Sequence, residues 1–324
     1  MILIISSLND ESTNDVIFWL KYLKKDFVRL NEDDIIVKIT LIEGSIVLKT
    51  TTQKRVNLSH ITGYWYRRGQ LRFLVNSFDY RKSNLSNQII DGVKAFKNGE
   101  VNKLIDYLYL YLDRIPKSIT SFFNVSPNKL HVLDMAKQCG LLIPKTMIST
   151  QKEDSIAFLL SCNSKCITKP INEIFFSNEN NMSYRSFTAP VSADDLKDMA
   201  DNSFFPMLMQ ETIDKKVEIR IFYLQGLCYS MGIFSQSDPT TAVDFRNYNN
   251  EQPNRCVPFK LPDNVLCKIV QLMNLLNYKT GSIDMLLDSA GNYYFLEINP
   301  IGQFGMVSIP CNYNIEKKIA NSLF

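Results

Sequence analysis

Short apolar runs alternate with amphipathic segments in the first third of the chain. Residues 1–6 carry five successive apolar side chains, which is typical of a buried strand. The next apolar residues recur at the spacing of one helix face, which predicts a helix that begins at Asp10 or Ser12 and reaches Lys25. Four strand-like runs and a long helical segment follow, at residues 27–30, 35–42, 45–51, 61–66 and 84–112. We expect Asn98 and Gly99 to divide the last segment into two helices.

The same alternation continues after residues 116–127, where we place a domain boundary. Helices are predicted at residues 128–139, 153–160, 192–201, 262–276 and 315–323. Strands are predicted at 166–169, 207–210, 217–223, 227–234, 281–287 and 293–297, and a hairpin at 174–177 and 184–188. The mixture indicates an α/β fold whose N-terminal α/β domain has about 120 residues.

Composition excludes several classes of protein. Lys and Arg number 36 against 33 Asp and Glu, and this net charge of +3 is too small for a protein whose main role is to bind nucleic acid. His60 and His131 are the only histidines, so a metal centre would have to use oxygen ligands and a hard cation. The seven cysteines form no CxxC pair, which is typical of reduced cysteines in the cytoplasm. Without a basic signal region or an apolar run of about 18 residues, we expect a soluble cytoplasmic protein with no membrane partner.

Two predicted strands near the C-terminus carry a pattern typical of a metal site. Glu297 and Asn299 are two residues apart and therefore lie on one face of a strand, and Asp284 on the preceding strand can reach that face. Two carboxylates and an amide oxygen suit Mg²⁺. A polar hairpin edge with solvated carboxylates explains the pattern equally well.

A lysine and a later strand carry two weaker signals. Lys169 closes an apolar strand and can direct its ammonium group at a phosphate, although an exposed strand end is the commoner role. Residues 211–213 form a bend that can hold an adenine edge, and Glu218 on the next strand can accept hydrogen bonds from ribose hydroxyls.

The order of these features resembles the ATP-grasp ligases, in which two α+β lobes clamp ATP. The resemblance covers residues 128–324 and implies a central lobe at 121–205 and a C-terminal lobe at 206–324, after the N-terminal domain at 1–120. It implies ATP and Mg²⁺ as cofactors. The implied contacts are Lys129 and Lys169 with phosphates, Glu211, Thr212 and Ile213 with adenine, Glu218 with ribose, and Asp284, Glu297 and Asn299 with Mg²⁺.

One departure concerns the loop after Lys169, at residues 171–187. Many ATP-grasp enzymes cover the phosphates there with a glycine-rich loop, because glycine lets the backbone approach closely. This loop contains no glycine. The phosphate lid is therefore in doubt, or side chains take over its task.

Four further segments resemble the maturases of graspetides, the microviridin-type peptides: residues 63–68, 168–170, 244–246 and 299–303. The first residues are most similar to the branch named for grasp-with-spasm clusters. These ligases phosphorylate Asp or Glu side chains of a ribosomal precursor peptide and join them to Ser or Thr hydroxyls or Lys amines. The resemblance implies such a peptide as partner, ω-ester or ω-amide macrocycles as product, and a homodimer.

Three residues are candidates for catalysis in this scheme. Arg220 and Arg246 can steady an acyl phosphate or the acidic side chain, because a guanidinium matches both bidentately. Asp244 can orient Arg246 or help to remove the hydroxyl proton. A surface ion pair worth less than about 1 kcal/mol is the alternative for Asp244 and Arg246.

The peptide is expected to contact two further regions. Arg67 and Arg68 follow an aromatic strand and either bind the peptide or pack as a strand end. The family resemblance points to a leader-binding hairpin and helix: Phe175, Phe176 and Phe187 as an apolar groove, and Asp194, Asp195 and Asp198 as acidic contacts. These aspartates are equally explained by the preference of a helix N-terminus for acidic residues.

Two other functions stay open from the sequence. One is an ATP-grasp carboxylate–amine ligase that acts on a small amino acid or a protein tail. The other is a non-catalytic peptide-binding module that responds to ATP, which the glycine-free loop keeps possible.

Overall fold

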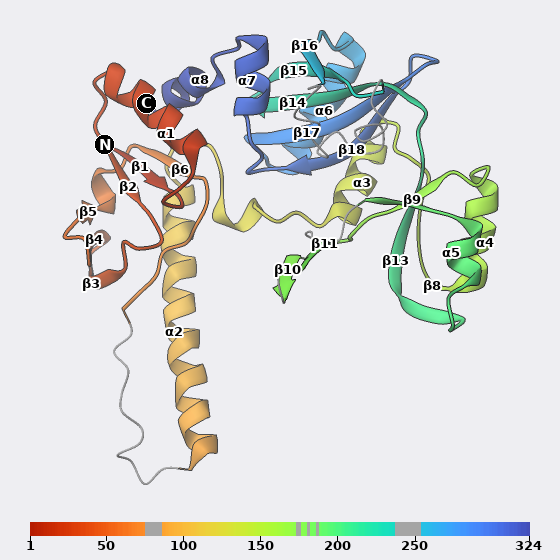
Figure 1. The fold of residues 1–324 in the computed structure, drawn as a ribbon. Helices are drawn as coiled ribbons and strands as arrows, with labels where there is room; N and C mark the ends of the chain where they lie inside the picture. Colours follow the sequence, from red (N-terminus) through yellow and green to blue (C-terminus); the bar gives the residue numbers. More distant parts are fainter. Residues whose placement is uncertain (75–85, 173–175, 180–181, 186–187, 237–253) are drawn as a thin grey trace. The chain divides into compact units, whose positions relative to one another are not determined.

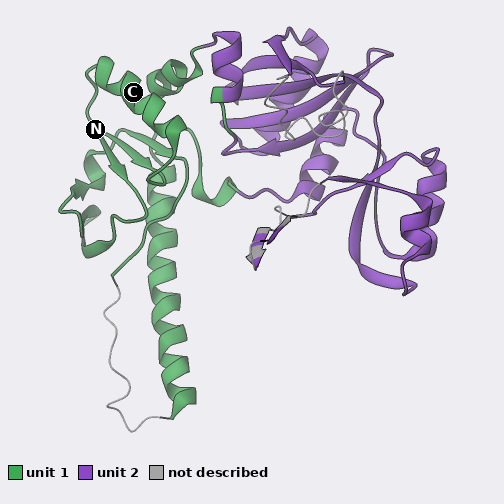
Figure 2. Cartoon of the chain, viewed as in Figure 1, with its two compact units in different colours: residues 1–125, 303–305, 314–324 green, residues 126–302, 306–313 purple. Residues whose placement is uncertain are grey.

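The computed structural model describes residues 1–324 except 75–85, 173–175, 180–181, 186–187 and 237–253 (Figure 1). The chain divides into two compact units (Figure 2). Unit 1 comprises residues 1–125, 303–305 and 314–324, and unit 2 comprises residues 126–302 and 306–313.

A parallel sheet forms the centre of unit 1, in the order β2-β1-β6-β7. Its strands are β1 (Ile2–Ile5), β2 (Phe27–Leu30), β6 (Gly63–Tyr66) and β7 (Lys117–Ser118). Every residue of β1 is buried, as expected for a central strand covered on both faces. Helix α1 (Glu11–Tyr22) begins at Asp10, whose carboxylate accepts a hydrogen bond from the Thr13 amide at 3.0 Å.

A small antiparallel sheet and a long helix complete the N-terminal part. The sheet consists of β3 (Ile36–Ile42), β4 (Ser45–Thr50) and β5 (Arg55–Asn57), of which β5 was not predicted. Helix α2 runs without interruption over Asn87–Asp113. The expected break at Asn98 and Gly99 is therefore wrong, because an internal glycine weakens a helix by only about 1 kcal/mol and does not end it.

The C-terminal helix returns to unit 1. Helix α8 (Ile315–Ser322) packs against α1. The chain end also lies against β6, since a Cβ atom at Gly63 would overlap the carbonyl oxygen of Leu323. The last residues are thus part of the core of unit 1.

The first sheet of unit 2 has the order β12-β9-β13-β8 and is antiparallel throughout. Its strands are β8 (Thr146–Gln151), β9 (Cys166–Thr168), β12 (Ala189–Val191) and β13 (Ser203–Glu211). Helices α4 (Lys152–Ser161) and α5 (Ala193–Lys197) accompany it, and α5 is shorter than the predicted helix at 192–201. The hairpin pairs β10 (Phe176–Glu179) with β11 (Met182–Arg185) and is displaced from the predicted strands.

The second sheet of unit 2 has the order β16-β15-β14-β17-β18. Its strands are β14 (Lys215–Leu224), β15 (Leu227–Phe234), β16 (Arg255–Pro258), β17 (Thr280–Asp288) and β18 (Tyr293–Asn299). Helices α3 (Lys129–Gln138) and α6 (Asp263–Leu275) pack on it through a continuous apolar core that includes Val132, Ile269 and Ile283. Strand β16 and helix α7 (Gly305–Cys311) were not predicted.

Candidate nucleotide and metal site

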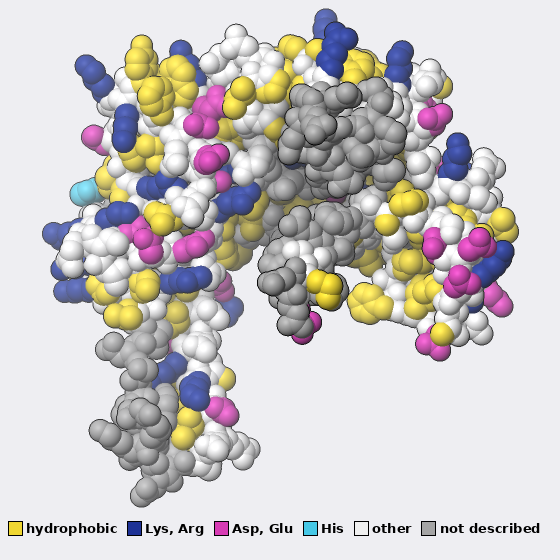
Figure 3. All heavy atoms as spheres, in the orientation of Figure 1, with side chains coloured by type: hydrophobic (Ala, Val, Ile, Leu, Met, Phe, Trp, Pro, Cys, Tyr) yellow, Lys and Arg dark blue, Asp and Glu magenta, His cyan; other side chains and the backbone are white. Residues whose placement is uncertain are grey.

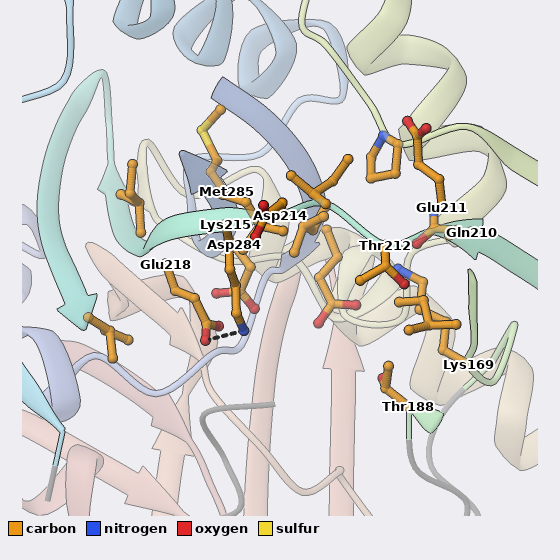
Figure 4. Close-up of a pocket in the computed structure, with 18 of the residues that line it drawn as sticks. Lys169, Thr188, Gln210, Glu211, Thr212, Asp214, Lys215, Glu218, Asp284 and Met285 are labelled. Atoms are coloured by element: carbon orange, nitrogen blue, oxygen red, sulfur yellow. Dashed lines mark hydrogen bonds and ion pairs between the residues drawn. The ribbon is translucent and has the colours of Figure 1, made fainter. Parts of the chain in front are cut away.

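A cavity of about 350 Å³ lies in unit 2 and is lined by both of its larger sheets (Figure 4). Eight residues that the sequence predicted for the site line it: Lys169, Glu211, Thr212, Ile213, Glu218, Arg220, Asp284 and Glu297. Apolar side chains form much of the wall and can cover a flat ring: Ile167, Ile213, Ile219, Ile233, Met285, Leu286 and Leu296. The cavity therefore combines an apolar wall with charged groups from several strands.

A row of charged residues crosses three neighbouring strands. Arg220 on β14 lies opposite Asp284 on β17, and Asp284 lies opposite Glu297 on β18. Both carboxylate oxygens of Asp284 accept hydrogen bonds from Nη1 of Arg220. The two side chains are only 12% and 17% exposed. Directly opposed residues share one face of a sheet, so the register brings two carboxylates and a guanidinium together at the cavity.

Asn299 lies two residues beyond Glu297 on β18, opposite Ser282 and outside this row, and it does not line the cavity. It is exposed, and its Oδ1 accepts a hydrogen bond from the Ile301 amide at 3.1 Å. Within the described residues, no group of three or more His, Cys, Asp and Glu side chains is arranged to hold a metal ion. The predicted set has two carboxylates and one amide, and its all-oxygen chemistry suits Mg²⁺, which usually keeps several waters.

Glu218 is held by two neighbours. Its Oε1 accepts hydrogen bonds from Nζ of Lys215 and from Oγ of Ser235, each at 2.6 Å. Figure 4 shows Lys215 and Glu218 joined in the cavity beside Asp284. Lys215 was not predicted as a site residue. It is the first residue of β14, and the one signal in the sequence is its position three residues before Glu218.

The bend that was predicted to meet adenine is fixed by backbone and side-chain contacts. Glu211 exchanges backbone and side-chain hydrogen bonds with Lys145: its amide donates to the Lys145 carbonyl at 3.0 Å, and its Oε1 accepts from the Lys145 amide at 2.8 Å. The Thr212 amide donates to the Lys165 carbonyl at 2.9 Å. Lys165 and Gln210 also line the cavity and were not predicted.

The two lysines expected at phosphates lie in different places. Lys169 follows β9 and lines the cavity. Lys129, at the start of α3, donates from Nζ to the carbonyls of Pro170 at 3.2 Å and Asn172 at 2.7 Å. It thus holds the beginning of the glycine-free loop, and its contact with phosphate stays a prediction.

Arg67 is buried inside unit 1. It is 3% exposed and lies 3.4 Å from Asp10, and its Nη2 donates to Oε1 of Gln303 at 3.0 Å. Burial lowers the pKa of Arg67 to about 10. Arg68 is more exposed and lies 3.5 Å from the same aspartate. Arg67 is therefore a buried residue of unit 1 and not a solvated strand end, and a contact of either arginine with the peptide stays a prediction.

The predicted leader-binding region is described only in part. Phe175 and Phe187 lie outside the described residues, and so does the side chain of Phe176. Asp195 forms a capping box with Ser192, and the hydrogen bonds from the Ser192 hydroxyl and amide lower the pKa of this carboxyl. Asp194 and Asp198 are exposed in and just after the same helix, and Figure 3 shows acidic side chains gathered over α4 and α5. Asp244 and Arg246 also lie outside the described residues.

Solved structures identify the fold. No protein-family model and no curated protein sequence matches the chain. It is similar to an ATP-grasp ligase from Chryseobacterium gregarium, associated with a ribosomally synthesised, modified peptide and solved with ADP and a leader and core peptide. The two are 25% identical with a TM-score of 0.81, over 99% of this chain and 96% of that chain.

Two other structures extend the comparison. Macrocyclase MdnC from Microcystis aeruginosa, bound with precursor peptide MdnA, is 24% identical with a TM-score of 0.78, over 100% of this chain and 99% of that chain. ATP-grasp ligase PsnB, solved with a precursor variant, Mg and ADP, is 17% identical with a TM-score of 0.69, over 99% of this chain and 97% of that chain.

The chain has the ATP-grasp fold, preceded by an N-terminal α/β domain, and the predicted fold class is confirmed. Its resemblance to the graspetide-type maturases is confirmed as well, because the match extends over essentially the whole chain. None of the helices in the described part of the chain is long and apolar enough to cross a bilayer.

Proposed function

We propose that this chain is an ATP- and Mg²⁺-dependent macrocyclase of a ribosomal precursor peptide. The observation that carries the proposal is the full-length match, at 25% identity and a TM-score of 0.81, to an ATP-grasp ligase solved with ADP and a leader and core peptide. The charged row at Arg220, Asp284 and Glu297 supports it, since it lies beside an apolar wall in the same cavity.

The chemistry is activation of a carboxylate followed by its capture. A carboxylate oxygen of the peptide attacks the γ-phosphorus of ATP, ADP leaves, and an acyl phosphate forms. A Ser or Thr hydroxyl or a Lys amine then attacks the acyl carbon and gives up a proton, phosphate leaves, and an ω-ester or ω-amide closes the ring. Such transfer depends on positioning and charge neutralisation more than on a protein nucleophile.

The residues of the cavity divide these tasks. Lys169 supplies a positive charge to the phosphates, and Arg220 steadies the acyl phosphate or the acidic side chain. Asp284 and Glu297, with Asn299 at the strand end, would hold Mg²⁺, which supplies further charge neutralisation when bound. Asp244 and Arg246 remain candidates for orientation and proton removal.

Incubation with a precursor peptide encoded beside this gene, together with ATP and Mg²⁺, tests the proposal. We expect ADP release and the loss of one water molecule from the peptide for each crosslink, followed by mass spectrometry. ATP turnover that leaves the peptide mass unchanged would exclude macrocyclisation and favour another carboxylate–amine ligase. Peptide binding without any turnover would favour a non-catalytic module.

Two variants separate catalysis from peptide binding. Lys169→Ala and Glu297→Ala should each abolish phosphoryl transfer while leader binding, measured by fluorescence anisotropy, stays within about twofold of wild type. If either variant still cyclises the peptide at the normal rate, the site assignment is wrong.

The cellular location and the oligomeric state of the enzyme follow from the same reasoning. We infer that the enzyme acts in the cytoplasm, where ATP and a newly made peptide occur together, and the seven unpaired cysteines agree with a reducing compartment. We also propose a homodimer, which sedimentation of the purified protein would test.

A further inference from the structure

We propose that Lys215 and Ser235 position Glu218 for the ribose of the nucleotide and thereby set the preference of the site for ribonucleotides. This inference rests on the proposed function, because it assumes that an adenine nucleotide occupies the cavity. Lys215 and Ser235 are positioning residues in this scheme, since they act through Glu218.

Lys215 and Ser235 hold one oxygen of Glu218 in place. Nζ of Lys215 and Oγ of Ser235 both donate to the same oxygen, Oε1 of Glu218, at 2.6 Å. Ser235 is 1% exposed, and the side chains of Lys215 and Glu218 are 8% and 10% exposed. A carboxylate fixed by two short hydrogen bonds in a buried place has one orientation and little rotational freedom.

The Glu218 carboxylate is a hydrogen-bond acceptor at the cavity. An ionised carboxylate has about four acceptor positions, so it can accept hydrogen bonds from several donors at once. Glu218 lines the cavity beside Ile219 and Ile233, which form part of the apolar wall. A ligand hydroxyl that reaches the carboxylate there would find a fixed acceptor.

Lys215 also balances the charge of Glu218. Five acidic and four basic side chains are among the described residues that line the cavity. A triphosphate is repelled by uncompensated carboxylates, and a buried carboxylate without a partner is costly. Lys215 compensates Glu218 locally, as Arg220 compensates Asp284, so Glu218 can serve as an acceptor in an anion-binding cavity.

The neighbouring residue offers a matched control. Lys216 is exposed and does not line the cavity, although it precedes the same strand residues as Lys215. Removing either ammonium changes the net charge equally. Only Lys215→Met should alter the contact of Glu218 with ribose.

The experiment is calorimetric titration of ATP and of 2′,3′-dideoxy-ATP, with Mg²⁺, into wild type, Lys215→Met, Lys216→Met and Ser235→Ala. Wild type should bind ATP more tightly than the dideoxy nucleotide. Lys215→Met should weaken ATP binding about tenfold and the dideoxy nucleotide much less, so that discrimination between them is lost. Ser235→Ala should shift in the same direction, and Lys216→Met should match wild type.

Other outcomes distinguish a failure of this inference from a failure of the proposed function. Equal weakening of both nucleotides by Lys215→Met would overturn the inference and indicate direct contact with phosphate. Unchanged discrimination in both Lys215→Met and Ser235→Ala would also overturn it, while ATP binding by wild type would leave the proposed function intact. If wild type binds no adenine nucleotide, the proposed function fails and the inference fails with it. Should Lys215→Met not fold, Ser235→Ala carries the same comparison, and Lys215→Arg, which keeps the charge and a donor, should keep the discrimination.

Discussion

Asp284 lies opposite Arg220 across β14 and β17, and both of its carboxylate oxygens accept hydrogen bonds from Nη1 of that arginine. A residue proposed as a metal ligand is therefore oriented by a guanidinium on the neighbouring strand. Glu297 lies opposite Asp284 on the other side. The sheet register thus sets the order cation, carboxylate, carboxylate along one face, and each change in this row has a distinct expected effect.

Asp284→Asn should lower Mg²⁺-dependent ATP turnover by about a hundredfold or more, because an amide is a neutral and weaker metal ligand. The amide side chain would still offer Arg220 one oxygen acceptor, so we expect the variant to fold. Turnover is measured over a range of Mg²⁺ concentrations, together with the melting temperature. Asp263→Asn, at an exposed position in the first turn of α6, is the control. Normal turnover by Asp284→Asn would remove this residue from the metal site.

Gly302→Ala should destabilise unit 2 by about 1–3 kcal/mol, because a Cβ atom at this position would overlap Cβ and Oγ of Ser282. The same displacement should disturb Asn299, whose carbonyl accepts a hydrogen bond from the Gly302 amide at 3.0 Å. Urea unfolding measures the loss of stability. Adding Ser282→Gly removes both overlapping atoms and should restore part of the stability; a double variant no more stable than Gly302→Ala would contradict this explanation.

The main strands of the site could be predicted from the sequence, because continuous apolar runs mark them. Alternate residues of a strand lie on the same face of the sheet, so the polar residues could be assigned to a face. Asp284 and Glu297 could be placed on adjoining strands for this reason. The partner of Asp284 could not be predicted, because the register of β14 against β17 depends on pairing over 64 residues of sequence. Lys215 was missed for a similar reason: it stands next to Lys216 in a charged segment, and nothing in the sequence shows which of the two lysines is buried.

The N-terminal unit shows where local patterns fail. Arg67 follows a strand end and resembles a surface arginine in sequence, yet it is buried against Asp10 and Gln303, which lies 236 positions away. The break expected in α2 failed because local propensity is weak beside the cooperativity of a helix of 27 residues. Long-range contacts decide the burial of Arg67, and helix cooperativity decides the continuity of α2. Neither can be recognised from a short stretch of sequence.

Gly99→Ala should stabilise the protein by about 0.5–1 kcal/mol, because alanine has the higher helix propensity. A Cβ atom there would meet no atom within 4 Å among the described residues, and the position lies inside α2. Thermal unfolding measures the gain, with Gly63→Ala as the opposite case, since that Cβ would overlap the carbonyl of Leu323. A loss of stability in Gly99→Ala would indicate that the helix is not continuous at this position.

Asp10 should contribute to the pH dependence of the free energy of unfolding. Burial by itself would raise the pKa of this carboxyl, but the Arg67 guanidinium and the hydrogen bonds from Thr13 outweigh burial and hold its pKa below the ordinary value of 3.8. A carboxyl whose pKa is lower in the folded state stabilises the fold when it is ionised in both states. This contribution is therefore complete above about pH 4 and is lost as the pH falls through the folded-state pKa.

Asp10→Asn tests this linkage and the role of Arg67 together. Asparagine can still cap α1, so the change removes chiefly the charge that faces the buried Arg67. We expect the free energy of unfolding at pH 7 to fall by about 3 kcal/mol, because a buried guanidinium is left without its anion. The difference between wild type and variant should shrink below pH 4, whereas the exposed Asp26→Asn control should leave the profile unchanged. A difference that stays constant from pH 7 to pH 3 would mean that the Asp10 charge does not stabilise unit 1.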